Sequence, residues 1–171
     1  LEPSVADVTE TNDGDFVLTG SIRSGVSNIT NFFLARLNAA GDVLWSRKVA
    51  IDDLSTGNAI CKTGTNDFAI SGTAQTFGNG FDLCFLKVNY QGAVLWARTF
   101  AGVEGQYDLG GTVLSARDNS ILFGGESYTG GNDDWDNVLV KVRQDGSLAW
   151  SKRLGTTGVF SFDHHTSLLQ N

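Results

Sequence analysis

Several residue types are scarce or missing in this chain of 171 residues, which has no methionine, one proline, two cysteines and two histidines. Without a methionine there is no initiator, so Leu1 is expected to be a cut end rather than a translation start. No apolar run approaches the roughly 18 residues of a spanning helix, and the first residues lack the pattern of a signal peptide. Membrane insertion is therefore not expected.

Basic charge is also scarce, because 12 Lys and Arg stand against 19 Asp and Glu and leave a net charge of −7. The field of such a chain repels phosphate backbones, so nucleic acid is not expected as a partner. The 41% of hydrophobic residues is enough for a packed core and excludes a disordered tail or a collagen-like rod.

An internal repeat runs through the chain. Each copy has an apolar residue, three turn residues, a glycine, a short run and a tryptophan, and the copies lie at 37–45, 88–96 and 142–150. The structural positions that repeat are Gly41, Gly92 and Gly146, followed by Trp45, Trp96 and Trp150. A second matched stretch lies upstream in each copy, at 15–20, 67–72 and 120–125. Agreeing offsets in three copies indicate a repeat architecture.

Each copy is expected to form four short strands, since β-branched and aromatic runs alternate with turn residues and no helical period occurs. In the second copy the strands are predicted near 59–63, 68–72, 81–88 and 93–100. The third strand of each copy is apolar at successive positions, which predicts burial on both faces. Small antiparallel sheets stacked face to face meet that requirement, so the predicted fold is all-β with the blades of a β-propeller.

The repeat predicts three four-stranded antiparallel blades plus the first strand of a fourth. Their expected ranges are 1–54, 55–106 and 107–158, with the incomplete fourth blade at 159–171. Propellers usually close with about four to eight blades, so three blades are expected to be part of a larger ring. The missing neighbours are further blades, either from the same parent chain or from another copy.

The fragments 15–20, 85–89 and 92–98 resemble the tandem β-propeller repeats of large secreted or surface proteins. The Gly-x-x-x-Trp turn is also similar to the blade signature of pyrroloquinoline-quinone dehydrogenases and their cofactor-free relatives. This resemblance implies a scaffold that is extracellular or at the cell surface. It brings no catalytic motif, and because the chain has no adjacent cysteine pair, no cofactor is expected.

Most of the candidate site residues lie in one acidic loop that departs from the repeat. Asp133, Asp134 and Asp136 could supply oxygen ligands for calcium, and the alternative is a solvated acidic hairpin. Trp135 lies outside the repeated tryptophan position and could contact a sugar or a protein, or pack against a neighbouring blade. Asn28 begins an Asn-Ile-Thr glycosylation sequon on a predicted hairpin tip.

The reactive side chains do not form a catalytic set. Cys61 and Cys84 fall on the first and third strands of one copy, roughly 9 to 10 Å apart, so no disulfide is expected. His164 and His165 are adjacent and point to opposite faces of a strand, so they cannot hold one ion together.

Three functions remain open on this basis. The first is a non-enzymatic interaction or structural module of a larger extracellular or surface protein, which binds protein or glycan. The second is a cofactor-binding or hydrolytic propeller enzyme whose channel site is completed by missing blades. The third is an assembly subunit that completes a ring by oligomerisation.

Overall fold

The structure is a computed structural model, and it describes residues 2–23, 25, 29–51, 54–75, 80–100, 107–128 and 135–155. All regular structure in these residues is β-strand. The strands are β1 (Glu2–Glu10), β2 (Phe16–Arg23), β3 (Thr30–Leu37), β4 (Val43–Val49), β5 (Ser55–Thr63), β6 (Asp67–Gln75), β7 (Phe81–Val88), β8 (Val94–Phe100), β9 (Asp108–Ser115), β10 (Ile121–Tyr128), β11 (Trp135–Val142) and β12 (Leu148–Leu154).

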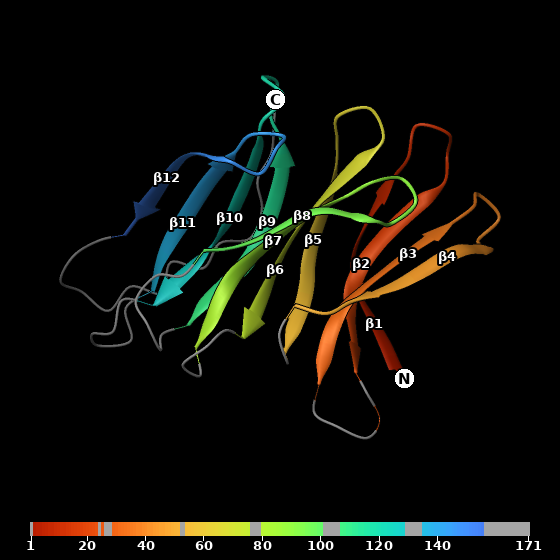
Figure 1. Cartoon of the computed structure of the whole chain (residues 1–171), viewed down its shortest axis with the longest axis horizontal. Helices are drawn as coiled ribbons and strands as arrows, with labels where there is room; N and C mark the ends of the chain where they lie inside the picture. Colours follow the sequence, from red (N-terminus) through yellow and green to blue (C-terminus); the bar gives the residue numbers. More distant parts are fainter. Residues whose placement is uncertain are drawn as a thin grey trace.

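The strands form three antiparallel sheets of four, in which each strand pairs with its neighbours in the chain. We call them the first sheet (β1–β4), the middle sheet (β5–β8) and the third sheet (β9–β12). Figure 1 shows them side by side in chain order. The all-β prediction and the prediction of three four-stranded sheets are confirmed, and the described sheets form an open stack. The strand predicted in 159–171 lies outside the described residues.

The irregularities of the sheets repeat as faithfully as the sequence does. Register shifts occur between the first and second strand of every sheet, for example at Val5/Asp7 and at Gly57/Ala59. Another shift occurs between the third and fourth strand of every sheet, next to Arg36, Lys87 and Lys141. A bulge bends and twists a strand locally, so the same local irregularities recur in all three sheets.

Two hydrophobic cores fill the spaces between the sheets. Phe32 and Leu34 of the first sheet pack with Phe68, Ile70 and other residues of the middle sheet. On the opposite face of the middle sheet, Phe85 packs with the third sheet in a second core. The ring of Phe85 stacks on that of Phe123, with centroids 3.9 Å apart. The middle sheet is therefore apolar on both faces, as its third strand predicts.

The sheets come closest along their first strands. A Cβ atom on Gly110 of β9 would lie 2.0 Å from the carbonyl oxygen of Gly72 in β6, so only glycine permits this approach. Strand β1 also contacts β5, and β5 contacts β9, whereas the outer strands β4, β8 and β12 make no comparable contacts with one another. The sheets consequently approach one another most closely along the edge formed by the first strands.

The strand predictions for the middle sheet are close to what is observed. The predicted 81–88 coincides with β7, and 93–100 differs from β8 by one residue. The predicted 59–63 is too short, because β5 begins at Ser55 and continues across the bulge. Cys61 on β5 and Cys84 on β7 are not joined by a disulfide, in agreement with the prediction.

Candidate functional site

The turn between the third and fourth strand of each sheet is built to a fixed shape. In the middle sheet, Asn89 accepts a backbone hydrogen bond from Gly92 at 2.9 Å, and its side-chain oxygen accepts one from Ala93 at 2.9 Å. Gly92 has φ 76°, a conformation that side chains disfavour. Gly41 and Gly146 take the same positive φ in the other two turns.

Gly92 and Gly146 leave the space in which the tryptophan ring of the preceding sheet lies. A Cβ atom on Gly92 would come within 2.9 Å of the Trp45 ring, and one on Gly146 within 2.9 Å of the Trp96 ring. Thus the missing side chain makes room for an indole. The repeated tryptophan of one sheet therefore contacts the repeated glycine of the next sheet, and not the glycine of its own sheet.

The indole nitrogens complete the same contact with hydrogen bonds. Trp45 donates to the carbonyl oxygen of Tyr90 at 3.3 Å, and Trp96 donates to that of Gln144 at 2.9 Å. Each acceptor lies two residues before the glycine of its turn. We call this contact, made once between each pair of neighbouring sheets, the tryptophan junction.

Basic side chains reinforce the tryptophan junctions. Arg36, Lys87 and Lys141 lie directly opposite the three repeated tryptophans in the strand register. Arg36 stacks over the ring of Tyr90 at 3.5 Å, and Lys87 reaches the carbonyl oxygen of Gln144 at 3.4 Å. Both cations therefore bind the turn of the following sheet.

Each of these cations is also neutralised within its own sheet. Ion pairs join Arg36 to Asp15 at 2.5 Å, Lys87 to Asp67 at 2.9 Å and Lys141 to Asp118 at 2.7 Å. Hydrogen bonds from Lys141 and Ser120 hold the pKa of Asp118 well below its usual range. Pairing of this kind lets a basic side chain lie against an indole at a buried edge.

The first junction carries one more set of polar contacts. Tyr90 donates a hydrogen bond to Asp13, and Arg36 pairs with Asp13 as well. Hydrogen bonds from Thr11 and Tyr90 lower the pKa of Asp13. Removal from water and the bond to Asp13 raise the pKa of the Tyr90 hydroxyl. Arg47 lies over the ring of Trp45, with its guanidinium carbon 5.6 Å from the ring centroid.

The two ends of the stack carry incomplete versions of the junction. Trp150 is 38% exposed, whereas Trp96 is 9% exposed, and no described turn receives Trp150. At the other end, no atom of the described residues lies within 4 Å of the Cβ position of Gly41. One end therefore presents an indole and the other presents a turn.

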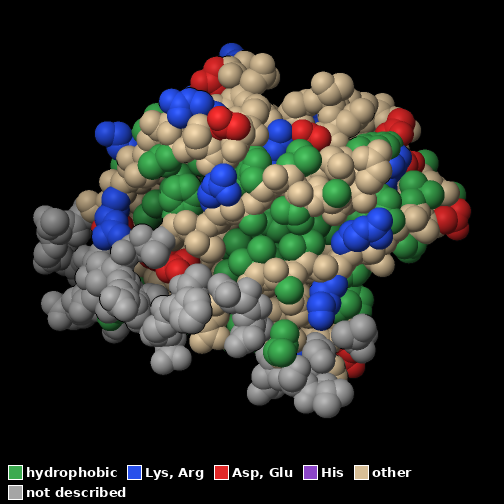
Figure 2. All heavy atoms as spheres, viewed as in Figure 1, with side chains coloured by type: hydrophobic (Ala, Val, Ile, Leu, Met, Phe, Trp, Pro, Cys, Tyr) green, Lys and Arg blue, Asp and Glu red, His purple; other side chains and the backbone are tan. Residues whose placement is uncertain are grey.

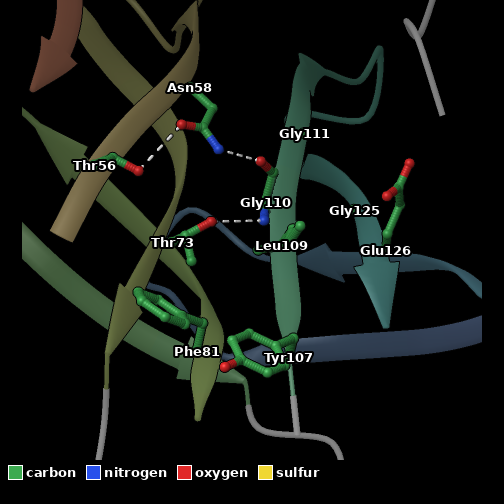
Figure 3. Close-up of a pocket in the computed structure, with 10 residues that line it drawn as sticks. All are labelled: Thr56, Asn58, Thr73, Phe81, Tyr107, Leu109, Gly110, Gly111, Gly125 and Glu126. Atoms are coloured by element: carbon green, nitrogen blue, oxygen red, sulfur yellow. Dashed lines mark hydrogen bonds between the residues drawn. The ribbon is translucent and has the colours of Figure 1, made fainter. Parts of the chain in front are cut away.

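A pocket of about 560 Å³ lies where β5 and β6 of the middle sheet face β9 and β10 of the third. Figure 3 shows the rings of Phe81 and Tyr107 together at one end of it, and their centroids are 5.6 Å apart. Asn58 donates a hydrogen bond to the carbonyl of Gly110, and the amide of Gly110 donates to Thr73 at 3.1 Å.

The aromatic pair of this pocket is a departure from the repeat. Thr30 and Leu54 occupy the matching places between the first and middle sheets, where they form the same isolated parallel bridge as Phe81 and Tyr107. Since the backbone bridge forms without rings, the fold does not require them. Aromatic residues at these two positions, where the first repeat has Thr30 and Leu54, are the signal in the sequence that points to this pocket.

The residues predicted for calcium are only partly within the described chain. Asp133 and Asp134 lie outside it, as does Asn28 of the sequon. Asp136 lies on β11 and forms an ion pair with Arg153 at 3.7 Å. Among the residues that the structure describes, no group of three or more acidic, histidine or cysteine side chains could hold a metal ion. Calcium binding by this loop stays a prediction.

Trp135 is half-buried and meets the ring of Tyr128 edge to face, with centroids 5.4 Å apart.

The two cysteines lie in different cores, because Cys84 belongs to the first core and Cys61 packs against the second. Burial raises the pKa of the Cys61 thiol to about 12. A thiol with so little thiolate at neutral pH is a packing residue rather than a nucleophile. His164 and His165 lie outside the described residues.

No known protein family and no curated protein matches this chain. Within the described ranges, no helix is long and apolar enough to cross a membrane.

Proposed function

We propose that the three sheets are blades of a β-propeller, and that the chain is a non-enzymatic interaction or structural module of a larger extracellular or surface protein. The observation that carries this proposal is the tryptophan junction. It recurs residue for residue between successive sheets, and its two halves are left open at the ends of the stack. A contact that repeats in this way supports an array with further members.

The arrangement of the strands supports a radial array over a flat one. The first strands of the sheets contact one another in series, while the outer strands do not. Sheets that converge at one edge and spread at the other are wedges, which suits blades around a central channel. The glycines at 57 and 110 allow the close approach that a channel edge needs.

Partner binding is assigned to the pocket between the middle and third sheets. The stacked rings of Phe81 and Tyr107 offer a platform for the apolar face of a sugar or for a protein side chain. Among the described residues that line the pocket (Figure 3), Glu126 carries the one carboxylate, and none is a histidine, lysine or cysteine. A lining of this kind favours binding of a protein or glycan over catalysis.

A further apolar surface follows the outer strands, where Val43, Leu44, Val94 and Leu95 are exposed. Figure 2 shows hydrophobic side chains near the middle of the face in view, with basic side chains around them. Exposed apolar surface rimmed by charge is typical of interaction sites. Because this surface is separate from the pocket, a substitution on it serves as the control for substitutions in the pocket.

Binding to arrays of glycans and peptides, followed by calorimetry on each hit, tests the proposed function. We expect Tyr107→Ala to weaken the pocket ligand at least about tenfold, because aromatic anchors dominate binding energy. Leu95→Ala on the outer surface is the matched control and is expected to bind as the unaltered protein does. Equal loss in both variants would contradict the pocket assignment. Chemical conversion of a bound ligand, abolished by Glu126→Gln, would contradict a non-enzymatic role.

A further inference from the structure

We propose that two copies of this chain dock head to tail, with Trp150 of each lying on the Asn38–Asp42 turn of the other. Both docking contacts form at once in such a pair, so it has twofold symmetry. The docking contact rests only on the junctions already described.

The exposed face of the first sheet is shaped like the covered faces of the other two. Val8 is 53% exposed, while the residues at the same repeat position, Ile60 and Val113, are 5% and 8% exposed. Those two are covered by the preceding sheet in each case. The first sheet thus presents an apolar face that matches a face buried twice within the same chain.

The outward face of the third sheet is expected to complement the exposed face of the first sheet. Leu122 and Leu139 are partly exposed there, and their equivalents in the middle sheet, Ala69 and Phe85, are fully buried against the third sheet. Trp150 stands on this face without a described receiver. Continuity with the two existing junctions therefore identifies the occupant as a sheet that carries the same glycine turn.

The first sheet supplies that turn in a usable form. Gly41 has φ 89° and open space at its Cβ position, and the carbonyl of Ala39 occupies the place of the acceptors Tyr90 and Gln144. An indole ring placed against Gly41 would therefore have both the space that the glycine leaves and the carbonyl of Ala39 as its hydrogen-bond acceptor. The backbone of the turn is already fixed by bonds between Asn38 and Asp42.

Charge adds a feature that the internal junctions lack. Arg47 reaches the turn of the middle sheet, where a Cβ on Gly92 would lie 3.2 Å from its side chain. Lys152 holds the same repeat position on the third sheet and is exposed. In the docked pair it faces Asp42, whereas the residues equivalent to Asp42, Ala93 and Ser147, are uncharged. This pairing favours docking of opposite ends over other contacts.

Light scattering after size exclusion, with sedimentation equilibrium for the dissociation constant, tests the proposal on the whole chain. The expected mass is twice the 18.3 kDa of one copy, with weaker association at high salt. Trp150→Ala is expected to raise the dissociation constant at least about thirtyfold, as central tryptophans do in interfaces. Gly41→Asn is also expected to raise the dissociation constant, because asparagine tolerates the positive φ but its side chain occupies the space that the indole needs.

Each variant has a matched control. Leu148→Ala removes an exposed apolar side chain of the same strand, at a position that stays exposed in all three sheets. Gly14→Asn alters a turn glycine of φ 84° that also has open space at its Cβ position. Both controls are expected to remain dimeric. Circular dichroism of Gly41→Asn checks that loss of the dimer is not loss of the fold.

A monomer at high micromolar concentration would overturn the proposal, as would equal weakening by Trp150→Ala and Leu148→Ala. A mass that keeps growing beyond the dimer would overturn the twofold pair. The binding pocket lies away from Trp150 and Gly41. Failure to dimerise therefore leaves ligand binding by the pocket intact, and failure to bind ligand leaves the dimer intact.

Discussion

The middle sheet and the first sheet carry nearly the same apolar pattern and differ in what covers it. Phe68 is fully buried in the middle sheet, and Phe16, at the same repeat position of the first sheet, is 39% exposed. The strand pairing and the turn geometry around them agree. The comparison teaches that the environment of each repeated residue is set by the neighbouring sheet rather than by its own.

Truncation of Phe68 and of Phe16 to alanine is expected to show the largest difference between the two sheets. Phe68→Ala leaves a cavity in the first core and is expected to lower the free energy of unfolding by about 3 to 5 kcal/mol. Phe16→Ala removes a partly exposed side chain and is expected to cost less than about 1 kcal/mol in the monomer. Urea unfolding at low protein concentration measures both. Equal losses would contradict a core that is built only between sheets.

The ion pairs extend the comparison to charge. Lys87 is almost fully buried in the middle sheet, and Asp67→Asn leaves that cation without its carboxylate. We expect a loss of about 3 kcal/mol, because a buried charge without its partner is costly. Asp118→Asn affects the more exposed pair with Lys141 in the third sheet, so its loss is expected to be much smaller. The reverse order in urea unfolding would contradict this account of the sheets.

The same third-sheet pair predicts a pH dependence. The pKa of Asp118 lies lower in the folded protein than the value of about 3.9 in an unfolded chain. Its ionised form therefore stabilises the fold above that value, and this stabilisation is lost as the pH falls further towards the folded pKa. Asp118→Asn is expected to flatten the fall in stability below about pH 4. Glu10→Gln, at the exposed end of β1, is the control and is expected to change the profile less.

Glycine substitutions separate the filled junction from the open one. Gly146→Ala and Gly41→Ala impose a similar backbone strain, since both residues have φ near 80° to 90°. Only Gly146→Ala also pushes a methyl group into the ring of Trp96. We expect it to cost about 1 to 3 kcal/mol more than Gly41→Ala in the monomer, as overpacking does. Thermal unfolding of the two variants measures the difference, and no difference would contradict close packing of the indole.

The cysteines report on the two cores separately. A pKa near 12 is expected to leave Cys61 roughly a thousandfold less thiolate than an ordinary thiol near 8.5 at the same pH. Cys84 is fully buried, so its labelling requires the first core to open. Labelling of Cys61→Ser and Cys84→Ser variants with a disulfide reagent at pH 8 gives each rate. Either thiol reacting as fast as in the unfolded chain would contradict the closed junctions.

Much of this architecture could be predicted from the sequence, because the repeat fixes strand, turn and tryptophan positions at once. The pairs that join the sheets could not. The partner of Trp45 is a backbone carbonyl 45 residues away, and any residue could supply it. The contact between Phe81 and Tyr107 could not be predicted either, since Phe81 begins β7 and Tyr107 directly precedes β9, and the repeat does not pair these positions. Spacing shows which positions recur, and contact between copies has to be seen in three dimensions.

Hydrogen exchange of the indole N–H groups, followed by nuclear magnetic resonance, tests the tryptophan junction most directly. Trp45 and Trp96 are expected to exchange slowly at every protein concentration, since their N–H groups are bonded across sheets. Trp150 is expected to exchange fast in dilute protein and slowly once copies associate. Equal exchange at Trp45, Trp96 and Trp150 in dilute protein would contradict the junction, and the account of the fold would fall with it.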